Sequence, residues 1–380
     1  MKVMHLMRTV RAIDGGPTRA LLDNVSVLSR RGHQVSVLAC EVDTGLLPER
    51  QVINLGQKVG SWPHLSSATK AAVKCEMSTT DILHVHLPWD PLNLSITKLA
   101  QEAGVPYCVS LRGTLDDWSM SQKWLKKRIY MAFFARQLLE GAAFVHCTAN
   151  DERRQSEVWY PQGRSKVIPN LLDLGPFKEL PGVEEARSRY RIRDGQPLIL
   201  FMSRLHAKKG LRFLIDAMSL VLVRSPAARL LVAGDGDARY VEKMRALVHD
   251  AGLSNSVEFI GHVNGSLKYS LLQAASCFVL PSSQENFGFA LFEAAAVGTP
   301  IVVTNLVDTW RELQSGASAE ITDQTAISVS KGILNIISTD EQQVAVQRAS
   351  SRAWALEYLD TDRIASMFEQ AYAEALRPRC

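Results

Sequence analysis

The sequence predicts an α/β protein of two domains, each built around a doubly wound parallel sheet. The chain has 380 residues, too many for one ordinary hydrophobic core, and its 46% hydrophobic and 22% charged residues are typical of a folded globular protein. Short β-branched apolar runs alternate with longer helical patterns along most of its length. A segment rich in proline, glycine and charge, residues 167–197, interrupts this alternation and divides it into two series.

In the first series, each apolar run is hydrophobic along its whole length, which is typical of a parallel strand buried on both faces. The clearest helix covers residues 18–30; Gly-Gly-Pro-Thr opens it, and Gly32 stops it. These elements predict a first domain over residues 1–170. Its predicted strands are residues 2–7, 34–40, 81–86, 106–111 and 142–148.

The second series repeats the pattern and predicts a second domain over residues 171–361. A helix, a break near residues 360–362 and another helix of about 362–380 end the chain. Because ligand sites in such domains lie outside the carboxyl ends of the strands, we expect a site in a cleft between the two domains. The predicted strands of this series are residues 198–205, 229–236, 257–263, 277–282 and 300–305.

The formal net charge is +4, and the positive charge is concentrated in the first half. Residues 1–170 carry 21 Lys and Arg against 15 Asp and Glu, and the remainder carries 22 against 24. A bias of this size indicates an anionic partner, such as a membrane surface or a phosphorylated substrate. It falls short of the basic surface that nucleic-acid binding requires, so we expect no nucleic-acid partner.

The cysteines and the apolar runs together indicate a cytoplasmic protein. The cysteines form no C-x-x-C pair and mostly stand in apolar contexts, so we expect buried free thiols in a reducing compartment. The first residues do not read as a signal peptide, and no run approaches 18 apolar residues, so no membrane span is expected. The cysteines are Cys40, Cys75, Cys108, Cys147, Cys277 and Cys380.

The stretch SSQENFGFALFEAAAVGTP, residues 282–300, contains two carboxylates in unusual places. Glu285 stands at the mouth of a loop, and Glu293 stands inside the apolar helix that we predict from about Phe289 to Val297. Burying a carboxylate without partners is costly or forces its protonation, so Glu293 needs partners. The hydroxyl groups of a ribose would serve, and a lysine or a local cap is the alternative. Glu285 is placed to meet a sugar or to stabilise positive charge developing on one.

Two nearby features add reasons to expect an anionic ligand. Gly288 lets backbone N–H groups approach a ligand closely, and the helix after it directs its positive end to the same place. Arg204 and Lys209 flank a loop that enters a helix near Leu211, which is a suitable place for a diphosphate. A solvated basic turn is the alternative for this pair.

The glycines of VAGDG do not form a dinucleotide-binding fingerprint. Gly234 and Gly236 follow a predicted strand, but Arg239 stands where the third glycine of G-x-G-x-x-G is required. The pattern is that of a plain turn into the next helix, and it disfavours a dinucleotide-dependent dehydrogenase.

These motifs resemble those of the retaining nucleotide-sugar glycosyltransferases of family 4, which have the GT-B fold. The resemblance implies an acceptor-binding first domain, a donor-binding second domain that faces it across a cleft, and a C-terminal helix that returns to the first domain. It extends over nearly the whole chain. The matching stretches are GGPTRALLDNVSVLSRRGHQVSVL, DILHVH, VIPNLLD, SRLHAKKG, VAGDG, VEFIGHV and CFVLPSSQENFGFALFEAAAVGTPIVVT.

The resemblance also implies roles for the matching residues. Arg204 and Lys209 would neutralise the donor diphosphate as it leaves. Glu293 would hold the ribose hydroxyls, and Glu285 would position the donor sugar. Further donor contacts are implied for Gly15, Gly16, Gly234, Asn286, Phe287 and Gly288.

Members of the family keep the anomeric configuration and need no obligatory metal, so the resemblance implies neither a metal nor a cofactor. The histidines of HVH, residues 84–86, have strand spacing and no carboxylate partner nearby, so we interpret them as a strand end rather than as a metal site.

The sequence departs from the family pattern in two places. Many relatives carry a histidine where this chain has Arg112, followed by Gly113; Arg112 would take over a contact with donor or acceptor, as in relatives that resemble bacterial surface-polysaccharide enzymes. A Gly-Gly pair after PIVVT is replaced by a loop that we expect to shape the choice of donor or acceptor. This loop contains Asp308, Trp310 and Glu312.

The segment 116–141 mixes aromatic and basic residues, which suits a helix on an anionic membrane surface. The residues concerned are Trp118, Lys123, Trp124, Lys126, Lys127 and Arg128. For the later turns we favour the alternative, an ordinary helix that buries Ile129, Phe133 and Leu138. The first turns leave both alternatives open, one of them a peripheral contact with the inner face of a membrane.

The function implied by the resemblance is transfer of a sugar from a nucleotide-diphosphate donor to a glycan or a lipid-linked oligosaccharide, in bacterial exopolysaccharide or lipopolysaccharide synthesis. A GT-B epimerase would need further acid–base carboxylates, and a phosphorylase would need a second phosphate site or a lysine-linked cofactor. A non-catalytic nucleotide-sugar-binding protein is a third alternative. The donor base, the sugar, the acceptor and the linkage are not assigned by these motifs.

Overall fold

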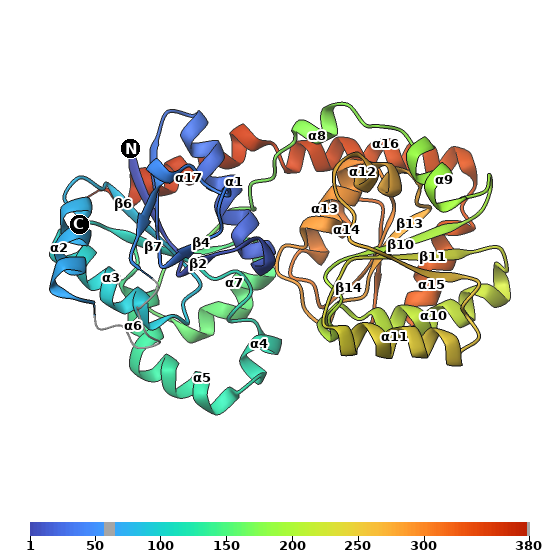
Figure 1. Ribbon diagram of the computed structural model, residues 1–380, viewed down its shortest axis with the longest axis horizontal. Helices are drawn as coiled ribbons and strands as arrows, with labels where there is room; N and C mark the ends of the chain where they lie inside the picture. Colours follow the sequence, from blue (N-terminus) through green and yellow to red (C-terminus); the bar gives the residue numbers. More distant parts are fainter. Residues whose placement is uncertain (57–64, 378–380) are drawn as a thin grey trace. The chain divides into compact units, whose positions relative to one another are not determined.

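A computed structural model describes residues 1–56 and 65–377, coloured along the chain in Figure 1. The chain divides into two compact units: unit 1 comprises residues 1–173 and 359–380, and unit 2 comprises residues 174–358. Each unit has its own parallel sheet with helices on both faces, so the predicted fold class is confirmed. The end of the predicted C-terminal helix, residues 378–380, lies outside the described residues.

The sheet of unit 1 has the strand order β5-β3-β1-β6-β7-β8-β9, and all neighbours are parallel. Every strand predicted for this half is present. Two edge strands were not predicted, because each has only three residues and none of them is buried. The strands are β1 Lys2–Leu6, β3 Gln34–Ala39, β5 Val52–Asn54, β6 Ile82–His86, β7 Tyr107–Ser110, β8 Phe144–Cys147 and β9 Ser165–Val167, and a separate pair joins β2 Thr9–Val10 to β4 Glu41–Val42.

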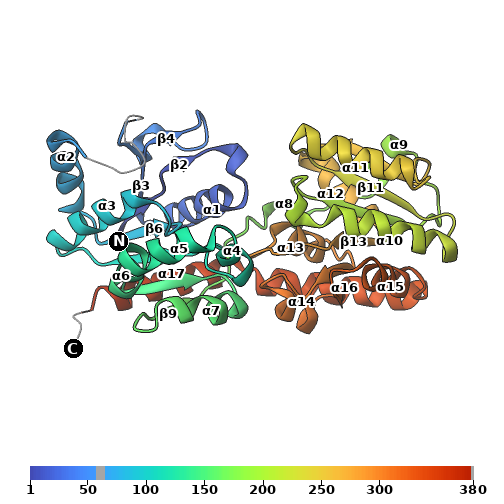
Figure 2. The same cartoon turned by 90° about the horizontal axis from the view of Figure 1, so that it is seen from below.

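The helices of unit 1 cover the two faces of this sheet in separate groups. α1 and α17 bury their apolar residues against one face, and α2, α3 and α6 pack on the other, with α2 and α17 labelled in Figure 2. The helices are α1 Gly16–Arg30, α2 Ser67–Met77, α3 Pro91–Glu102, α4 Asp117–Ser121, α5 Trp124–Tyr130, the π-helical turn Met131–Ala135, α6 Arg136–Gly141, α7 Asn150–Ser156 and α17 Thr361–Ala375.

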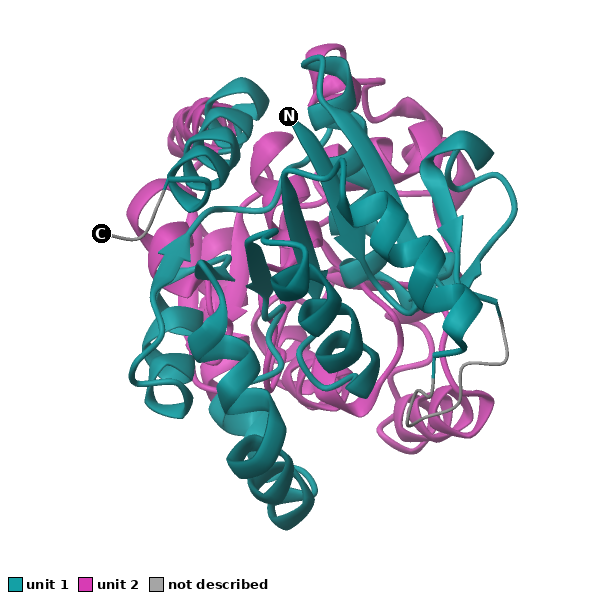
Figure 3. Ribbon diagram, turned by 90° about the vertical axis from the view of Figure 1, so that its left-hand side faces the viewer, with its two compact units in different colours: residues 1–173, 359–380 teal, residues 174–358 magenta. Residues whose placement is uncertain are grey.

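Unit 2, magenta in Figure 3, has the strand order β12-β11-β10-β13-β14-β15. β10 pairs in parallel with β11 on one side and with β13 on the other, where Ile199 lies opposite Cys277. The strands are β10 Leu198–Met202, β11 Arg229–Ala233, β12 Val257–Gly261, β13 Cys277–Leu280, β14 Ile301–Thr304 and β15 Ala319–Thr322. The helices are α8 Gly175–Lys178, α9 Glu184–Tyr190, α10 Leu211–Arg224, α11 Ala238–Asp250, α12 Gly265–Ala274, α13 Phe289–Ala296, α14 Trp310–Gly316, α15 Ala326–Ile337 and α16 Glu341–Tyr358.

The cysteines that the structure describes are free thiols, and most are buried as predicted. Cys75 is the exception: it lies on the exposed face of α2, where helical spacing alone did not show which side is covered. Cys380 lies outside the described residues.

A chain of buried hydrogen bonds attaches α17 to the sheet of unit 1. His146 Nε2 lies 2.8 Å from the carbonyl oxygen of Ile168, which can only accept, so this nitrogen donates and His146 Nδ1 accepts from Ser110 Oγ at 2.7 Å. Ser110 Oγ therefore accepts from His84 Nε2 at 2.6 Å, and His84 Nδ1 accepts from the Tyr372 hydroxyl at 2.7 Å. Burial lowers the pKa of His146 to about 3 and that of His84 well below its usual value, so both rings are neutral as this order requires.

Removing the Tyr372 hydroxyl should destabilise unit 1, because His84 Nδ1 would remain buried without a donor. We expect Tyr372→Phe to lower the free energy of unfolding by about 1–3 kcal/mol, measured by urea denaturation. Tyr130→Phe is the control, since the buried Tyr130 hydroxyl has no hydrogen-bond partner among the residues that the structure describes, and its loss should be neutral or stabilising. Equal effects of the two substitutions would contradict this order of hydrogen bonds.

Candidate active site

The strand order of unit 2 places a ligand site between β10 and β13. The chain leaves β10 toward β11 on one side, whereas β13 lies on the other side and continues to β14. Loops after adjacent strands diverge at such a switch point and leave a crevice at the carboxyl ends of the strands. The loop with Arg204 and Lys209 follows β10, and the loop with Glu285 follows β13.

These two loops are bonded to each other. The backbone N–H of Ser283 donates to the carbonyl oxygen of Lys208 at 2.8 Å, and the Lys209 ammonium forms an ion pair with the Glu285 carboxylate. Gly210 has φ +71°, and a Cβ there would lie 1.8 Å from the carbonyl oxygen of Pro281, so only glycine permits this approach. The structure thus brings Lys209 and Glu285 together.

The electrostatic environment of Lys209 is unusual for a lysine. Burial lowers its pKa to about 7, and the charges of Lys208 and Arg204 contribute to the decrease. An anion bound nearby would reverse this shift, because opposite charge favours the ammonium form. An anionic ligand would therefore increase the fraction of Lys209 that is protonated near neutral pH.

Arg204 is exposed on the same loop, next to the turn that contains Gly234. The backbone N–H of Leu205 donates to the carbonyl oxygen of Asp235 at 2.7 Å, which joins the two segments. A Cβ at Gly234 would lie 2.0 Å from the carbonyl oxygen of Ser203, so this glycine is needed for backbone packing. Its predicted contact with a donor stays a prediction.

The loop after β14 holds the Glu285 loop from the other side. Asp308 N–H donates to the Glu285 carbonyl oxygen at 2.9 Å, and Asn286 Nδ2 donates to Asp308 Oδ2 at 3.2 Å. The buried Thr309 hydroxyl donates to the carbonyl oxygen of Phe287 at 3.0 Å. Phe287 is buried, and Gly288 caps α13 in a left-handed conformation with φ +73°. Sequence reasoning missed Thr309, because no spacing links it to a residue 22 positions earlier.

Glu293 is 3% exposed, and its carboxylate has the lysine partner that was the alternative interpretation. Lys268 of α12 donates from Nζ to Glu293 Oε1 at 2.8 Å. Lys268 could not be identified from the sequence, because it lies 25 positions away on another helix. The ribose role of Glu293 stays a prediction.

In unit 1, the predicted phosphate contacts stand at the start of α1. Gly15 precedes the helix with φ 72° and ψ −128°, and Gly16 is its first residue. Gly15 has no side chain that could cap this end, so the first N–H groups of the helix have no acceptor from the N-cap side chain. The buried Thr18 hydroxyl, one turn later, has no hydrogen-bond partner within the described part of the chain.

Arg112 follows β7 in a left-handed conformation, φ 56°, and is 8% exposed. Its Nη1 donates to Asn170 Oδ1 at 2.8 Å, while Nε and Nη2 lie 3.2 and 3.1 Å from His86 Nδ1. His86 must then carry its proton on Nε2 and donate to His5 Nδ1 at 2.9 Å. Burial lowers the pKa of Arg112 to about 10, although the charge of Glu152 opposes the decrease. The guanidinium is a buried cation that donates hydrogen bonds to neutral Asn170 and His86. Such a cation is suited to meet an anion.

The ring nitrogens of His5, His84 and His86 come within 4.8 Å of one another, the spacing of a metal site. The interpretation of HVH as a strand end is correct, but it did not anticipate that His5 joins the cluster from β1. His84 uses both nitrogens for Tyr372 and Ser110, and His86 uses both for Arg112 and His5. A metal would displace these bonds beside a guanidinium, so the cluster fits a hydrogen-bond network better than a metal centre.

The surface of α5 and the turn after it differs from the favoured prediction. Ile129 is 51% exposed and Phe133 is 71% exposed, so the expected burial of both is wrong, whereas Leu138 is buried as expected. Trp124 and Leu125 are also exposed. We define the α5 surface as Trp124, Leu125, Ile129 and Phe133 with the flanking Lys123, Lys126 and Arg128.

Comparison with known proteins places the chain among sugar transferases. Residues 182–352 match the model of glycosyl transferases group 1, and residues 15–170 match that of the glycosyl transferase 4-like domain. The chain is 36% identical over 301 residues to an uncharacterized glycosyltransferase of Methanocaldococcus jannaschii, covering 73% of this chain and 74% of the relative. It is 27% identical over 380 residues to a phosphatidyl-myo-inositol mannosyltransferase of Mycobacterium tuberculosis, covering 95% and 93%.

A solved structure confirms the fold. Anabaena Alr3699/HepE, crystallised with UDP and glucose, superposes with a TM-score of 0.78 at 22% identity, covering 98% of this chain and 99% of that one. At this identity the likeness concerns the fold, which agrees with the predicted GT-B architecture.

The Glu293–Lys268 pair gives a test of the site's internal structure. Removal of one member should leave the other buried and uncompensated, at a cost of about 3–5 kcal/mol for a fully buried pair. We expect Lys268→Met and Glu293→Gln each to lower the free energy of unfolding toward that range in urea denaturation. The double variant should lose less than the sum of the single variants, and strict additivity would show that the two groups do not interact.

Proposed function

Because the chain belongs to the family of glycosyl transferases group 1, we propose that it moves a sugar from a nucleotide-diphosphate donor to a glycan or lipid-linked acceptor, with retention of the anomeric configuration. The observation that carries this proposal is the Lys209–Glu285 pair at the switch point of unit 2. It sets a cation for the diphosphate beside a carboxylate for the sugar. We propose unit 2 as the donor-binding domain and unit 1 as the acceptor-binding domain.

The proposed reaction exchanges one bond at the anomeric carbon. The bond from this carbon to the diphosphate oxygen breaks, and a bond to an acceptor hydroxyl oxygen forms on the same face. The acceptor proton passes to the leaving diphosphate. Lys209 and Arg204 stabilise the negative charge that develops on the diphosphate, and Glu285 lies beside the positive charge that develops on the sugar.

The remaining residues hold the donor in this scheme. The Lys268 ion pair favours the ionised form of Glu293, which accepts hydrogen bonds from ribose hydroxyls. Backbone groups of Asn286, Phe287 and Gly288, with Gly234, contact the donor. In unit 1, Gly15 and Gly16 offer backbone N–H groups, and Arg112 offers a buried cation, to an anionic group of donor or acceptor.

We further propose that the reaction needs neither a metal nor a cofactor. Lys209, Arg204 and Arg112 supply positive charge of the kind that a divalent ion supplies elsewhere. Both ring nitrogens of His84 and of His86 already take part in hydrogen bonds, which supports a reaction without a metal.

The α5 surface supports a lipid-linked acceptor. No helix among the described residues is long and apolar enough to cross a membrane. The exposed aromatic and aliphatic side chains of this surface, flanked by Lys123, Lys126 and Arg128, suit insertion into an anionic bilayer interface. We propose that the protein works at the inner, cytoplasmic face of a membrane in surface-polysaccharide synthesis, where relatives named for phosphatidylinositol also act on lipids.

Nucleotide binding and its pH dependence test the donor site. Thermal unfolding with UDP, GDP and ADP should show a shift with one of them, unchanged by EDTA; a ligand at 100 times its Kd adds about 2.7 kcal/mol of stability. Lys209 must be protonated to hold the diphosphate and has a pKa of about 7, so affinity should fall as pH rises above 7. Loss of one proton can lower the affinity by at most about tenfold per pH unit.

Lys209→Arg is the matched control, because arginine keeps its charge throughout this range. Its affinity should not change between pH 7.5 and 9. If the nucleotide affinity of Lys209→Arg decreased with pH as steeply as that of the wild type, protonation of Lys209 would not be what controls binding. No shift with any nucleotide would overturn the donor proposal, and binding without transfer would favour the non-catalytic binding protein.

Sedimentation with vesicles tests the α5 surface. Wild-type protein should bind vesicles that contain anionic phospholipid, and the bound fraction should fall with added salt. Trp124→Ser combined with Phe133→Ser should reduce binding at least tenfold. Val223→Ser is the control, since Val223 is an even more exposed apolar residue but lies on unit 2. If the wild-type protein did not bind anionic vesicles at low salt, this result would contradict the membrane proposal.

A further inference from the structure

A buried carboxylate in unit 1 joins two loops at the same edge of the sheet. Glu152 is 1% exposed and lies in the first turn of α7, the helix that follows β8. Its Oε2 accepts from the backbone N–H of Thr148 at 2.6 Å and from the Thr148 hydroxyl at 3.0 Å. A glutamate at this helical position commonly bonds back to the backbone at the start of its own helix. One of its two oxygens is thus used locally.

The other oxygen of Glu152 holds a distant turn. Oε1 accepts from the backbone N–H of Gly113 at 2.6 Å, 39 positions earlier in the chain. Gly113 belongs to the turn after β7, the strand that pairs in parallel with β8. The carboxylate therefore connects the loops that leave two adjacent strands. Sequence reasoning did not identify Glu152, because the fold rather than any local spacing brings it to Gly113.

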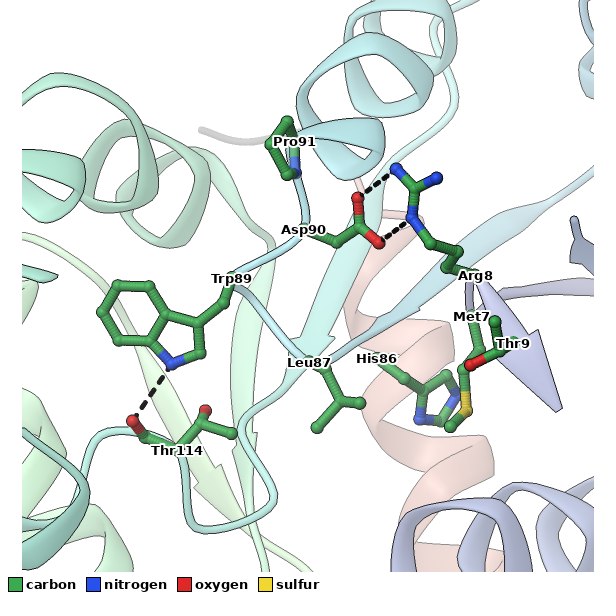
Figure 4. A pocket seen from close by; sticks show the side chains of 9 residues that line it. All are labelled: Met7, Arg8, Thr9, His86, Leu87, Trp89, Asp90, Pro91 and Thr114. Carbon is green, nitrogen blue, oxygen red and sulfur yellow. Dashed lines mark hydrogen bonds and ion pairs between the residues drawn. The ribbon is translucent and has the colours of Figure 1, made fainter. Parts of the chain in front are cut away.

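The turn after β7 needs such an anchor, because its backbone is strained. Arg112 and Gly113 both have left-handed conformations, with φ 56° and 68°, and this conformation is uncommon for a residue with a long side chain. Strain of this kind persists only where the surrounding structure imposes it. Figure 4, which shows the pocket next to this turn, displays a second anchor, the hydrogen bond of 3.1 Å from Trp89 Nε1 to the carbonyl oxygen of Thr114. Trp89 follows β6 and Glu152 follows β8, so the turn is held from both neighbouring strands.

The charges of Arg112 and Glu152 influence each other, yet their hydrogen bonds go to other groups. Burial lowers the pKa of Arg112, and the charge of Glu152 is the largest influence that opposes the decrease. The guanidinium donates to Asn170 and His86, whereas the carboxylate accepts from Gly113. A guanidinium has more N–H groups than these bonds use. Glu152 therefore favours the cation without occupying the N–H groups that an anionic ligand would need.

We propose that Glu152 is a positioning residue, which fixes the Arg112–Gly113 turn and so places the Arg112 guanidinium for an anionic group of the substrate. This role rests on the proposed function, in which Arg112 meets such a group. Glu152 acts through Arg112 rather than on the substrate, since its carboxylate is buried and bonded to the protein. Without the Gly113 bond the strained turn is free to relax, and the guanidinium is no longer held in one place.

Isothermal titration with pyrophosphate tests this role on the full chain. Lys209→Met is the background for every variant, because it removes the proposed diphosphate cation of unit 2. Arg112→Met should weaken pyrophosphate binding at least about tenfold, since a charged hydrogen-bond donor is lost. Glu152→Asp should weaken it at least about fivefold. Aspartate keeps the charge at the start of α7, but it is one methylene too short to reach Gly113 as well.

Thr148→Val is the matched control, because it removes one hydrogen bond to the same carboxylate and leaves the Gly113 bond in place. Its pyrophosphate affinity should stay within about twofold of the background, although the lost bond lowers its stability. Glu152→Asp combined with Arg112→Met should bind as weakly as Arg112→Met alone, because Glu152 acts through Arg112. Undiminished binding in Arg112→Met or Glu152→Asp, an equal loss in Thr148→Val, or additive losses in the double variant would each overturn the proposal.

Two further measurements separate the remaining outcomes. The Gly113 amide of the wild-type protein should exchange its hydrogen slowly, and fast exchange would overturn the proposal even if Glu152→Asp failed to fold. The thermal shift of the wild-type protein with UDP, GDP and ADP reports separately on the donor site. If no nucleotide gave a shift while pyrophosphate binding still depended on Arg112 and Glu152, the donor proposal would fail and the positioning role of Glu152 would stand.

Discussion

The ion pair between Lys209 and Glu285 is the interaction on which the proposed chemistry depends. It joins the loops that follow β10 and β13, and the contacts around it leave these loops little freedom. Gly210 permits the close approach to Pro281, and Asp308 and Thr309 hold the Glu285 loop from the far side. Without a ligand the two charges satisfy each other. With a diphosphate present, Lys209 has a stronger partner, and Glu285 becomes available to the sugar.

A different constraint organises unit 1, where buried histidines form hydrogen bonds in a fixed order. The Ile168 carbonyl oxygen sets the direction of one hydrogen-bond chain that ends at Tyr372, and Arg112 sets the direction of another that ends at His5. The first chain attaches α17 to the sheet. The second holds the buried guanidinium of Arg112. The attachment of α17 therefore depends on His146 and His84, and the position of Arg112 depends on His86 and His5.

Sequence reasoning succeeded where local pattern determines structure. Every predicted strand is present, because fully apolar runs between helical patterns have few alternatives. It failed where the outcome depends on what covers a surface. The apolar spacing of Ile129 and Phe133 is that of a buried helix face, yet no element in the described part of the chain buries them. Lys268 and Thr309 could not be predicted, because their partners are more than 20 positions away and only the fold brings them together.

Hydrogen–deuterium exchange with and without a saturating nucleotide diphosphate is the measurement that most directly tests the central claim. If the Lys209–Glu285 pair is the diphosphate site, amides of residues 203–210 and 282–288 should become protected on binding, and Lys209→Met should abolish this protection. Protection confined to other segments, with these two loops unchanged, would contradict the assignment of the donor site.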